Sequence, residues 1–94
     1  MRRLRVPDDV AALIRGLHPD LKRKVRSALG DIAGDPAIGK RLRDELEGLR
    51  GCRVSRYRIV YRVSGAAIEL VAVGPRRTIH QETWRRVRKS SPAF

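Results

Sequence analysis

The sequence predicts an α+β domain in which an αα-hairpin packs on one face of a small, mostly antiparallel twisted sheet, in the order β-α-α-β-β-β-α. Residues 57–63 read YRIVYRV, where one side is aromatic and β-branched and Arg58 and Arg62 are on the other, as in a half-buried strand. Residues 10–32 instead carry apolar side chains at helical spacing. Residues 67–73 are apolar on both faces except for Glu69, which is typical of a strand at a sheet centre.

Start and stop signals divide the first half of the chain. Residues 2–6 alternate and predict a short edge strand. Pro7 and two following acids open a helix, because proline suits the first turn and acids favour the positive end of the helix dipole. The pair His18-Pro19 breaks this helix and starts a second one, which ends at residues 34–36. Two amphipathic helices joined by a tight break form an αα-hairpin that needs a sheet to cover its apolar stripe.

The second half predicts the sheet and a last helix. Residues 35–48 keep no period, so we expect a loop there, with a turn of helix near residues 42–46. Strands are expected at residues 49–54, 56–64 and 67–73, and a short basic helix from about Ile79. Since 94 residues suffice for one modest core, we interpret residues 1–94 as a single domain.

Charge bounds the kind of partner. The net charge is +12 and the pI is near 11.5. Residues 1–47 hold 11 basic and 8 acidic side chains, whereas residues 48–94 hold 11 basic and 2 acidic ones. Such a balance indicates nucleic acid or an acidic protein as the partner. The lone Cys52 allows no internal disulfide, and no long apolar run suggests a signal peptide or membrane span, so we expect a cytoplasmic protein without a membrane partner.

Several kinds of chemistry lack the residues they need. Two histidines 62 positions apart and one cysteine do not form a metal site, no glycine-rich phosphate loop is present, and no paired acids project from one element. We therefore expect no metal and no cofactor. What remains is a group of arginines around a predicted hairpin and His80 beyond the last strand. RNA cleavage by its own 2′-hydroxyl needs little more than fixed cations aimed at a phosphate and a group that moves protons.

Residues 46–61 fit the string L-x-G-L-x-x-x-R-V-x-x-Y-R-I-x-Y, and residues 73–77 read VGPRR. This pattern resembles the RelE/ParE superfamily of type II toxin–antitoxin toxins, in its RelE-like branch, and the resemblance covers nearly the whole chain. It implies a RelE-like microbial RNase fold and a metal-independent, ribosome-dependent mRNA endonuclease that inhibits translation. It also implies a cognate antitoxin as partner beside mRNA and ribosome, with a homodimer mainly within the toxin–antitoxin complex.

The resemblance implies roles for particular residues. Arg58 matches the arginine that contacts the scissile phosphate, and Arg76 matches the one that stabilises the transition state, with Arg77 as a close rival. His80 stands where the family commonly has a tyrosine and keeps acid–base chemistry possible. Arg53 is the catalytic candidate on the strand where ribonuclease members often carry two lysines. Candidates for RNA binding are Arg56, Arg62, Arg77, Arg85 and Lys89.

Other interpretations of the same residues remain open. The arginines could be solvated on an exposed sheet face or in loops, and His80 could be a helix residue without a chemical role. At the level of function, the alternatives are a ParE-like inhibitor of DNA gyrase without nuclease activity and a plain nucleic-acid-binding module. Arg58, Arg76 and His80 together favour the ribonuclease, since a gyrase inhibitor needs no acid–base residue near a phosphate site.

Overall fold

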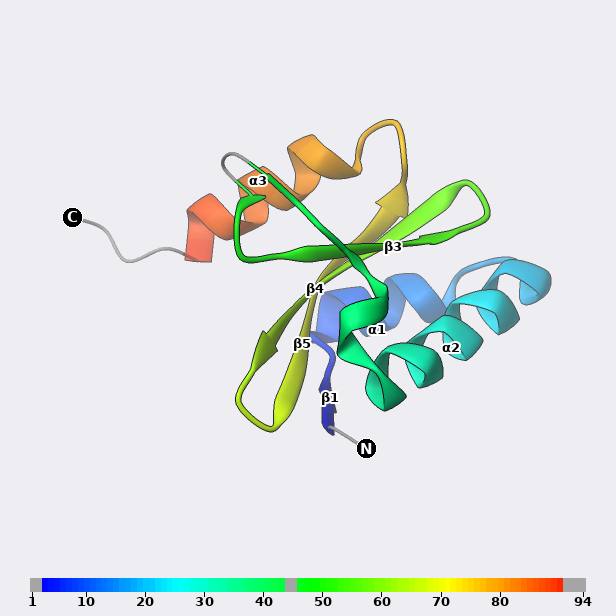
Figure 1. Ribbon diagram of the computed structural model, residues 1–94. Coiled ribbons are helices and arrows are strands. Elements are labelled where there is room, and N and C mark those ends of the chain that lie inside the picture. The colour runs from blue at the N-terminus through cyan, green and yellow to red at the C-terminus, as the bar shows by residue number, and fades with distance from the viewer. Residues whose placement is uncertain (1–2, 44–45, 91–94) are drawn as a thin grey trace.

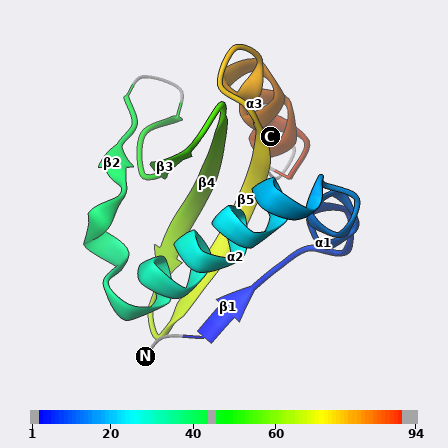
Figure 2. The ribbon, with the colours of Figure 1, turned by 90° about the vertical axis from the view of Figure 1, so that its right-hand side faces the viewer.

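The computed structural model describes residues 3–43 and 46–90, with side chains up to Val87. Its sheet has five strands in the order β1-β5-β4-β3-β2, and the helices α1 and α2 lie across one face of it (Figures 1 and 2). The elements are β1 (Arg3–Arg5), α1 (Asp8–Arg15), α2 (Pro19–Gly34), the 3-10 helix η1 (Pro36–Ile38), β2 (Lys40–Arg41), β3 (Arg50–Val54), β4 (Tyr57–Ser64), β5 (Ala67–Pro75) and α3 (Ile79–Ser90). The predicted α+β fold, with its αα-hairpin on a mostly antiparallel sheet, is confirmed.

The first strand is at the edge of the sheet, as expected, and it is the only described strand that pairs in parallel. It runs beside the start of β5, from Arg3 opposite Ala67 to Arg5 opposite Glu69. Beyond Glu69 none of the described strands pairs with this edge of β5, because the chain leaves β1 and enters α1. The remaining pairs, β2 with β3, β3 with β4 and β4 with β5, are antiparallel.

One strand escaped prediction. The expected loop at residues 35–48 contains η1 and the two-residue strand β2, whose Lys40 and Arg41 pair with Gly51 and Arg50. Two residues are too few to show a period in the sequence. Pairing with β3 creates this strand, and the Arg50 guanidinium secures it by donating a hydrogen bond to the Gly39 carbonyl at 2.7 Å. The helical turn expected near residues 42–46 includes residues 44 and 45, which lie outside the described residues.

The larger core lies between the αα-hairpin and the sheet. Val25 and Ile32 of α2 and Ile59, Tyr61 and Ile68 of the sheet are completely buried there. Their spacing follows the periods seen in the sequence: Val25 and Ile32 are seven residues, or two helical turns, apart, and Ile59 and Tyr61 are two residues apart on the strand. The register prediction for β4 is therefore correct, with Ile59 and Tyr61 facing the hairpin and Arg58 on the other face of the sheet.

A buried tyrosine holds the segment that follows α2. The Tyr61 hydroxyl donates a hydrogen bond to the Pro36 carbonyl at 2.6 Å and accepts one from the Gly39 amide at 2.9 Å. A Cβ on Gly39 would overlap the tyrosine ring, so the backbone approaches this closely only because residue 39 is glycine. Desolvation by burial raises the pKa of the Tyr61 hydroxyl, so the neutral form that can donate is maintained.

We expect Tyr61→Phe to lower the free energy of unfolding by about 1–3 kcal/mol, because it leaves the buried Gly39 amide and Pro36 carbonyl without this partner. Urea denaturation followed by circular dichroism measures the effect. Tyr57→Phe, on the same strand and face but only half-buried, is the matched control and should change stability less. Equal midpoints for Tyr61→Phe and wild type would show that the two hydrogen bonds contribute nothing net.

The last helix packs on the face of the sheet opposite the αα-hairpin. A second core unites Ile79 and Val87 of α3 with Val60 and Ala72 of the sheet, and Leu42, Leu46 and Leu49 complete it. A bulge in β5 prepares this face: the step from Val60 to Tyr61 on β4 is matched by a step from Ala72 to Leu70 on β5, which leaves Val71 as an extra residue. Both Val71 and Ala72 then belong to the second core.

An arginine of α3 joins the two layers around the open edge of β5. Arg86 Nε donates to the carbonyl of Val71 at 2.7 Å, and its two terminal nitrogens bind the Asp9 carboxylate of α1. The bulged residue Val71 thus has its carbonyl satisfied by a side chain instead of a strand. The hydrogen bond from Arg86 holds the pKa of Asp9 below its usual range.

None of the described helices is long and apolar enough to cross a membrane.

The Asp9–Arg86 pair predicts a pH-dependent part of the stability. Because the pKa of Asp9 is lower in the folded protein than in the unfolded chain, its contribution is complete above the ordinary aspartate range and is lost as the pH falls through the folded pKa. Asp9→Asn should therefore lower the urea midpoint at pH 7, and the difference from wild type should shrink at about pH 3, below the ordinary aspartate range. A difference that is the same at both pH values would contradict this assignment.

Candidate functional site

Two arginines stand opposite each other on the sheet face away from the αα-hairpin. Only Ser55 and Arg56 separate β3 from β4, with Ser55 in the left-handed region at φ 57°, and this tight turn fixes Arg53 directly opposite Arg58. Like charges so placed repel each other across a strand pair. No acidic side chain that the structure describes forms an ion pair with either one. An anion that binds both guanidiniums would relieve this repulsion, so the pair is suited to anion binding.

The aliphatic part of the Arg58 side chain packs over Gly51. A Cβ built on Gly51 would lie 3.0 Å from Cδ of Arg58 and 3.4 Å from a methyl group of Leu42. The absence of a side chain at residue 51 thus leaves room for the aliphatic part of Arg58, which is half-buried while Arg53 is exposed. Arg58 leans from β4 towards β3 as a result, and its direction is set by packing as well as by register.

The turn after β5 brings two more arginines and a histidine to the same end of the sheet. The Arg76 amide donates to the Arg56 carbonyl at 2.8 Å, so the β5–α3 turn is joined to the β3–β4 turn. The side chains of Arg76 and Arg77 are exposed in this turn, and His80 is exposed in the first turn of α3. We call the resulting group the sheet-end cluster; it consists of Arg53, Arg56, Arg58, Arg76, Arg77 and His80.

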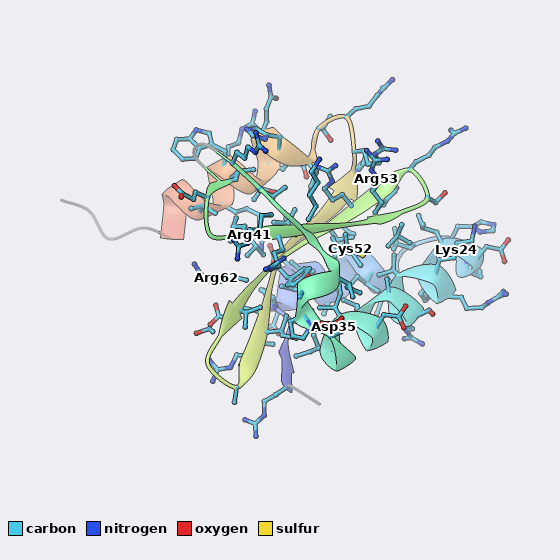
Figure 3. All side chains as sticks on the ribbon, in the orientation of Figure 1. Lys24, Asp35, Arg41, Cys52, Arg53 and Arg62 are labelled. Atoms are coloured by element: carbon cyan, nitrogen blue, oxygen red, sulfur yellow. The ribbon has the colours of Figure 1, made fainter. Side chains whose placement is uncertain are left out.

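The structure does not place every predicted residue in this cluster. Arg62 lies four residues along β4 from Arg58, roughly 13 Å away, and pairs with Glu69 at 2.9 Å. Figure 3 shows Arg53 and Arg62 at opposite ends of the sheet. Arg85 is exposed on α3, about 7 Å along the helix from His80. Lys89 is in α3, but its side chain lies outside the described residues.

An acidic residue beside the cluster was missed by the sequence analysis. A Cβ built on Gly74 would lie 3.2 Å from Oε2 of Glu82, so this carboxylate lies over Gly74. Gly74 is the partner of Arg58 in the pairing of β4 with β5. The signal that could have identified Glu82 is its rarity, because residues 48–94 contain only two acids, of which the other is Glu69.

Cys52 is placed as a strand residue and not as a nucleophile. It is half-buried on β3 and packs against the larger core, on the face opposite the sheet-end cluster. Burial raises the pKa of its thiol and the charge of Asp31 raises it further, so the reactive thiolate is disfavoured. Among the side chains that the structure describes, no group of three histidine, cysteine or acidic residues is placed to hold a metal ion.

Comparisons with known proteins agree with the fold and with the sequence pattern. The sequence model of a family described as the ParE toxin of type II toxin–antitoxin systems matches residues 5–80. A chain of the toxin–antitoxin complex RelBE2 from Mycobacterium tuberculosis is 28% identical, with a TM-score of 0.70, and the match covers 80% of this chain and 98% of that one. No curated protein matches the sequence.

Two further solved structures share the fold at lower identity. An E. coli RelE toxin variant in the free state is 20% identical with a TM-score of 0.75, over 96% of this chain and 98% of that one. A chain of the archaeal RelE–RelB complex from Pyrococcus horikoshii is 19% identical with a TM-score of 0.65, over 80% of this chain and 94% of that one.

Proposed function

The chain belongs to the ParE toxin family of type II toxin–antitoxin systems, within the RelE/ParE superfamily, and on that premise we propose that it is an mRNA endonuclease that acts on translating ribosomes. The observation that carries the proposal is the pair of opposed arginines, Arg53 and Arg58, with the turn arginines and His80 beside them. Inhibition of translation in the cytoplasm follows from cleavage of the message.

The chemistry asks little of the protein. The 2′-hydroxyl of the message attacks the adjacent phosphorus and the 5′-oxygen leaves, so the nucleophile belongs to the substrate. Arg53 and Arg58 bind the scissile phosphate, and Arg76 stabilises the charge that gathers on it in the transition state. His80 serves proton transfer, because imidazole gives or takes a proton near neutral pH. The ribosome holds the message in place and supplies the in-line geometry that a single sheet face leaves open.

The test is to map 5′ ends in a reconstituted translation reaction. We expect cuts in the message that is threaded through ribosomes and almost none in the same RNA when it is free. Cleavage of free RNA at the same rate would remove the ribosome from the proposal. An intact message in both reactions would overturn the nuclease function itself.

The second candidate function is inhibition of DNA gyrase without nuclease activity. The observation that favours gyrase inhibition is the family match, because the matching sequence model is that of the ParE toxin. The two functions separate in a gyrase assay, where a gyrase inhibitor would leave cleaved DNA and an uncut message. They also separate by substitution, because exchange of His80 for alanine should affect proton transfer in a nuclease and leave a purely electrostatic inhibitor active.

A cognate antitoxin is the protein partner that we propose. Both RelBE2 and the archaeal RelE were solved as complexes with their antitoxins. For this chain, an acidic or amphipathic segment would cover the strand face from Arg53 to Arg62 or displace α3. The α3 interface is suited to exchange, because the Thr83 hydroxyl is buried in it without a hydrogen-bond partner among the described residues. A homodimer would form mainly within that complex.

Capture of the antitoxin should depend strongly on salt. Because the sheet-end cluster is dense in exposed positive charge, long-range attraction should accelerate association with an acidic segment, and this attraction is screened within about 8 Å at physiological ionic strength. Stopped-flow association rates should therefore fall from low to physiological salt while dissociation rates change less. Association rates that are independent of ionic strength would contradict electrostatic capture.

A further inference from the structure

The sheet-end cluster contains five arginines and no group that readily accepts a proton except His80. Arginine stays protonated in proteins, so it cannot remove the proton of a 2′-hydroxyl. Transfer of two protons is nevertheless required, one from the attacking hydroxyl and one to the leaving oxygen. A single histidine covers one of them. The cluster as predicted from sequence is therefore one proton-transfer group short.

Glu82 stands where the missing group is needed. Its carboxylate lies over Gly74, 3.2 Å from the position that a Cβ there would take. Gly74 is directly opposite Arg58, and Cβ positions of such partners are about 4.5–5.5 Å apart on the same face. The carboxylate thus lies beside Arg58 on the β5 side, while the stem of Arg58 leans over Gly51 to the β3 side. A phosphate bound by Arg53 and Arg58 would have this carboxylate at its flank.

The carboxylate is also not held in an ion pair. Glu69, the other acid of residues 48–94, pairs with Arg62. The basic neighbour of Glu82 one turn along α3 is Arg86, whose guanidinium is bound to Asp9 and to the Val71 carbonyl. Glu82 forms no ion pair with any side chain that the structure describes. The charge of Glu82 acts on Arg86 and helps to raise the pKa of that guanidinium, but the Glu82 side chain is exposed and remains accessible to a substrate.

We propose that Glu82 is the general base of the cleavage reaction, an inference that rests on the proposed ribonuclease function. The carboxylate takes the proton of the 2′-hydroxyl as the 2′-oxygen forms its bond to phosphorus. The bond from phosphorus to the 5′-oxygen breaks, and the 5′-oxygen receives a proton from the His80 imidazolium. The products are a 2′,3′-cyclic phosphate and a 5′-hydroxyl, and neither water nor an oxidant takes part.

Glu82→Gln should slow single-turnover cleavage of ribosome-bound mRNA about a hundredfold or more, the usual loss when a proton acceptor is removed. The exchange is isosteric and the side chain is exposed, so the fold is expected to persist. Glu69→Gln is the matched control, since it makes the same change on the same sheet face at the other end, and its rate should equal that of wild type.

An mRNA with sulfur in place of the scissile 5′-oxygen distinguishes loss of the general base from loss of the general acid. Thiolate leaves without a proton, so this substrate should restore the rate of a variant that lacks the acid, His80→Ala, and leave Glu82→Gln slow. A merely structural role for Glu82 would not predict that difference. If Glu82→Gln cleaves the ordinary message at the wild-type rate, or if sulfur restores it as it restores His80→Ala, Glu82 is not the base.

Gly74→Ala provides an independent readout. The added methyl group would lie 3.2 Å from Oε2 of Glu82 and 3.0 Å from Cδ1 of Ile79, so it should displace the carboxylate. It should slow cleavage in the wild-type background and have no further effect on the rate in the Glu82→Gln background, because coupled residues are not additive. Equal slowing in both backgrounds would overturn the proposal. If wild type itself leaves ribosome-bound mRNA intact, the ribonuclease function fails first and this inference fails with it.

Discussion

Replacing Arg58 by alanine is expected to slow cleavage of ribosome-bound mRNA about a hundredfold or more. A well-placed donor aimed at the charge of the transition state is worth roughly 3–4 kcal/mol. The effect should fall on the chemical step, because Arg58 is the half-buried member of the cluster and its direction is fixed by Gly51. Affinity for the ribosome should change much less, since many other basic residues contribute to binding. Single-turnover cleavage and ribosome binding, measured on the same variant, separate the two effects.

Arg62→Ala is the matched control for this experiment. It removes the same charge from the same strand and face, but Arg62 is paired with Glu69 and lies outside the sheet-end cluster. Its cleavage rate should remain close to that of wild type, whereas Arg76→Ala should resemble Arg58→Ala. Equal losses in Arg58→Ala and Arg62→Ala would mean that the sheet face acts through its total charge, which is the behaviour of a plain nucleic-acid-binding module.

The alternation in residues 57–63 was sufficient to predict which face Arg58 occupies. A period of two leaves only two registers for a strand, and burying the aromatic side selects one of them. The αα-hairpin was equally predictable, because Pro7, His18-Pro19 and the acids at each start define its ends by local chemistry. Positions that depend on local spacing and on one buried face can thus be predicted from sequence.

Features that depend on distant pairing could not be predicted. The strand β2 exists because Lys40 and Arg41 meet β3, and the ion pair between Asp9 and Arg86 joins residues 77 positions apart. The bulge at Val71 turns both Val71 and Ala72 towards α3. The sequence of β5 could not reveal it, because β5 is apolar on both faces and a shift in its alternation leaves no trace. The role of Glu82 was not predicted for the same reason, since its position beside Arg58 depends on how α3 packs on that face.

His80 gives the second large effect that we expect. If His80 donates the proton to the leaving oxygen, His80→Ala should slow cleavage about a hundredfold, within the usual range for a group that transfers a proton. His80→Tyr, which introduces the residue that the family commonly has there, should retain more activity than alanine, because a phenol also donates a proton. Single-turnover cleavage of ribosome-bound mRNA compares the three proteins.

The pH dependence of the cleavage rate tests the same assignment, because a general acid predicts the direction of the change. An imidazole that acts as acid must be protonated, so the wild-type rate should decline as the pH rises and the protonated form is lost. The tyrosine variant should lack this decline at neutral pH, because a phenol keeps its proton there. If His80→Ala cleaves at the wild-type rate with an unchanged pH profile, His80 is a helix residue without a chemical role, and the leaving oxygen takes its proton from another donor.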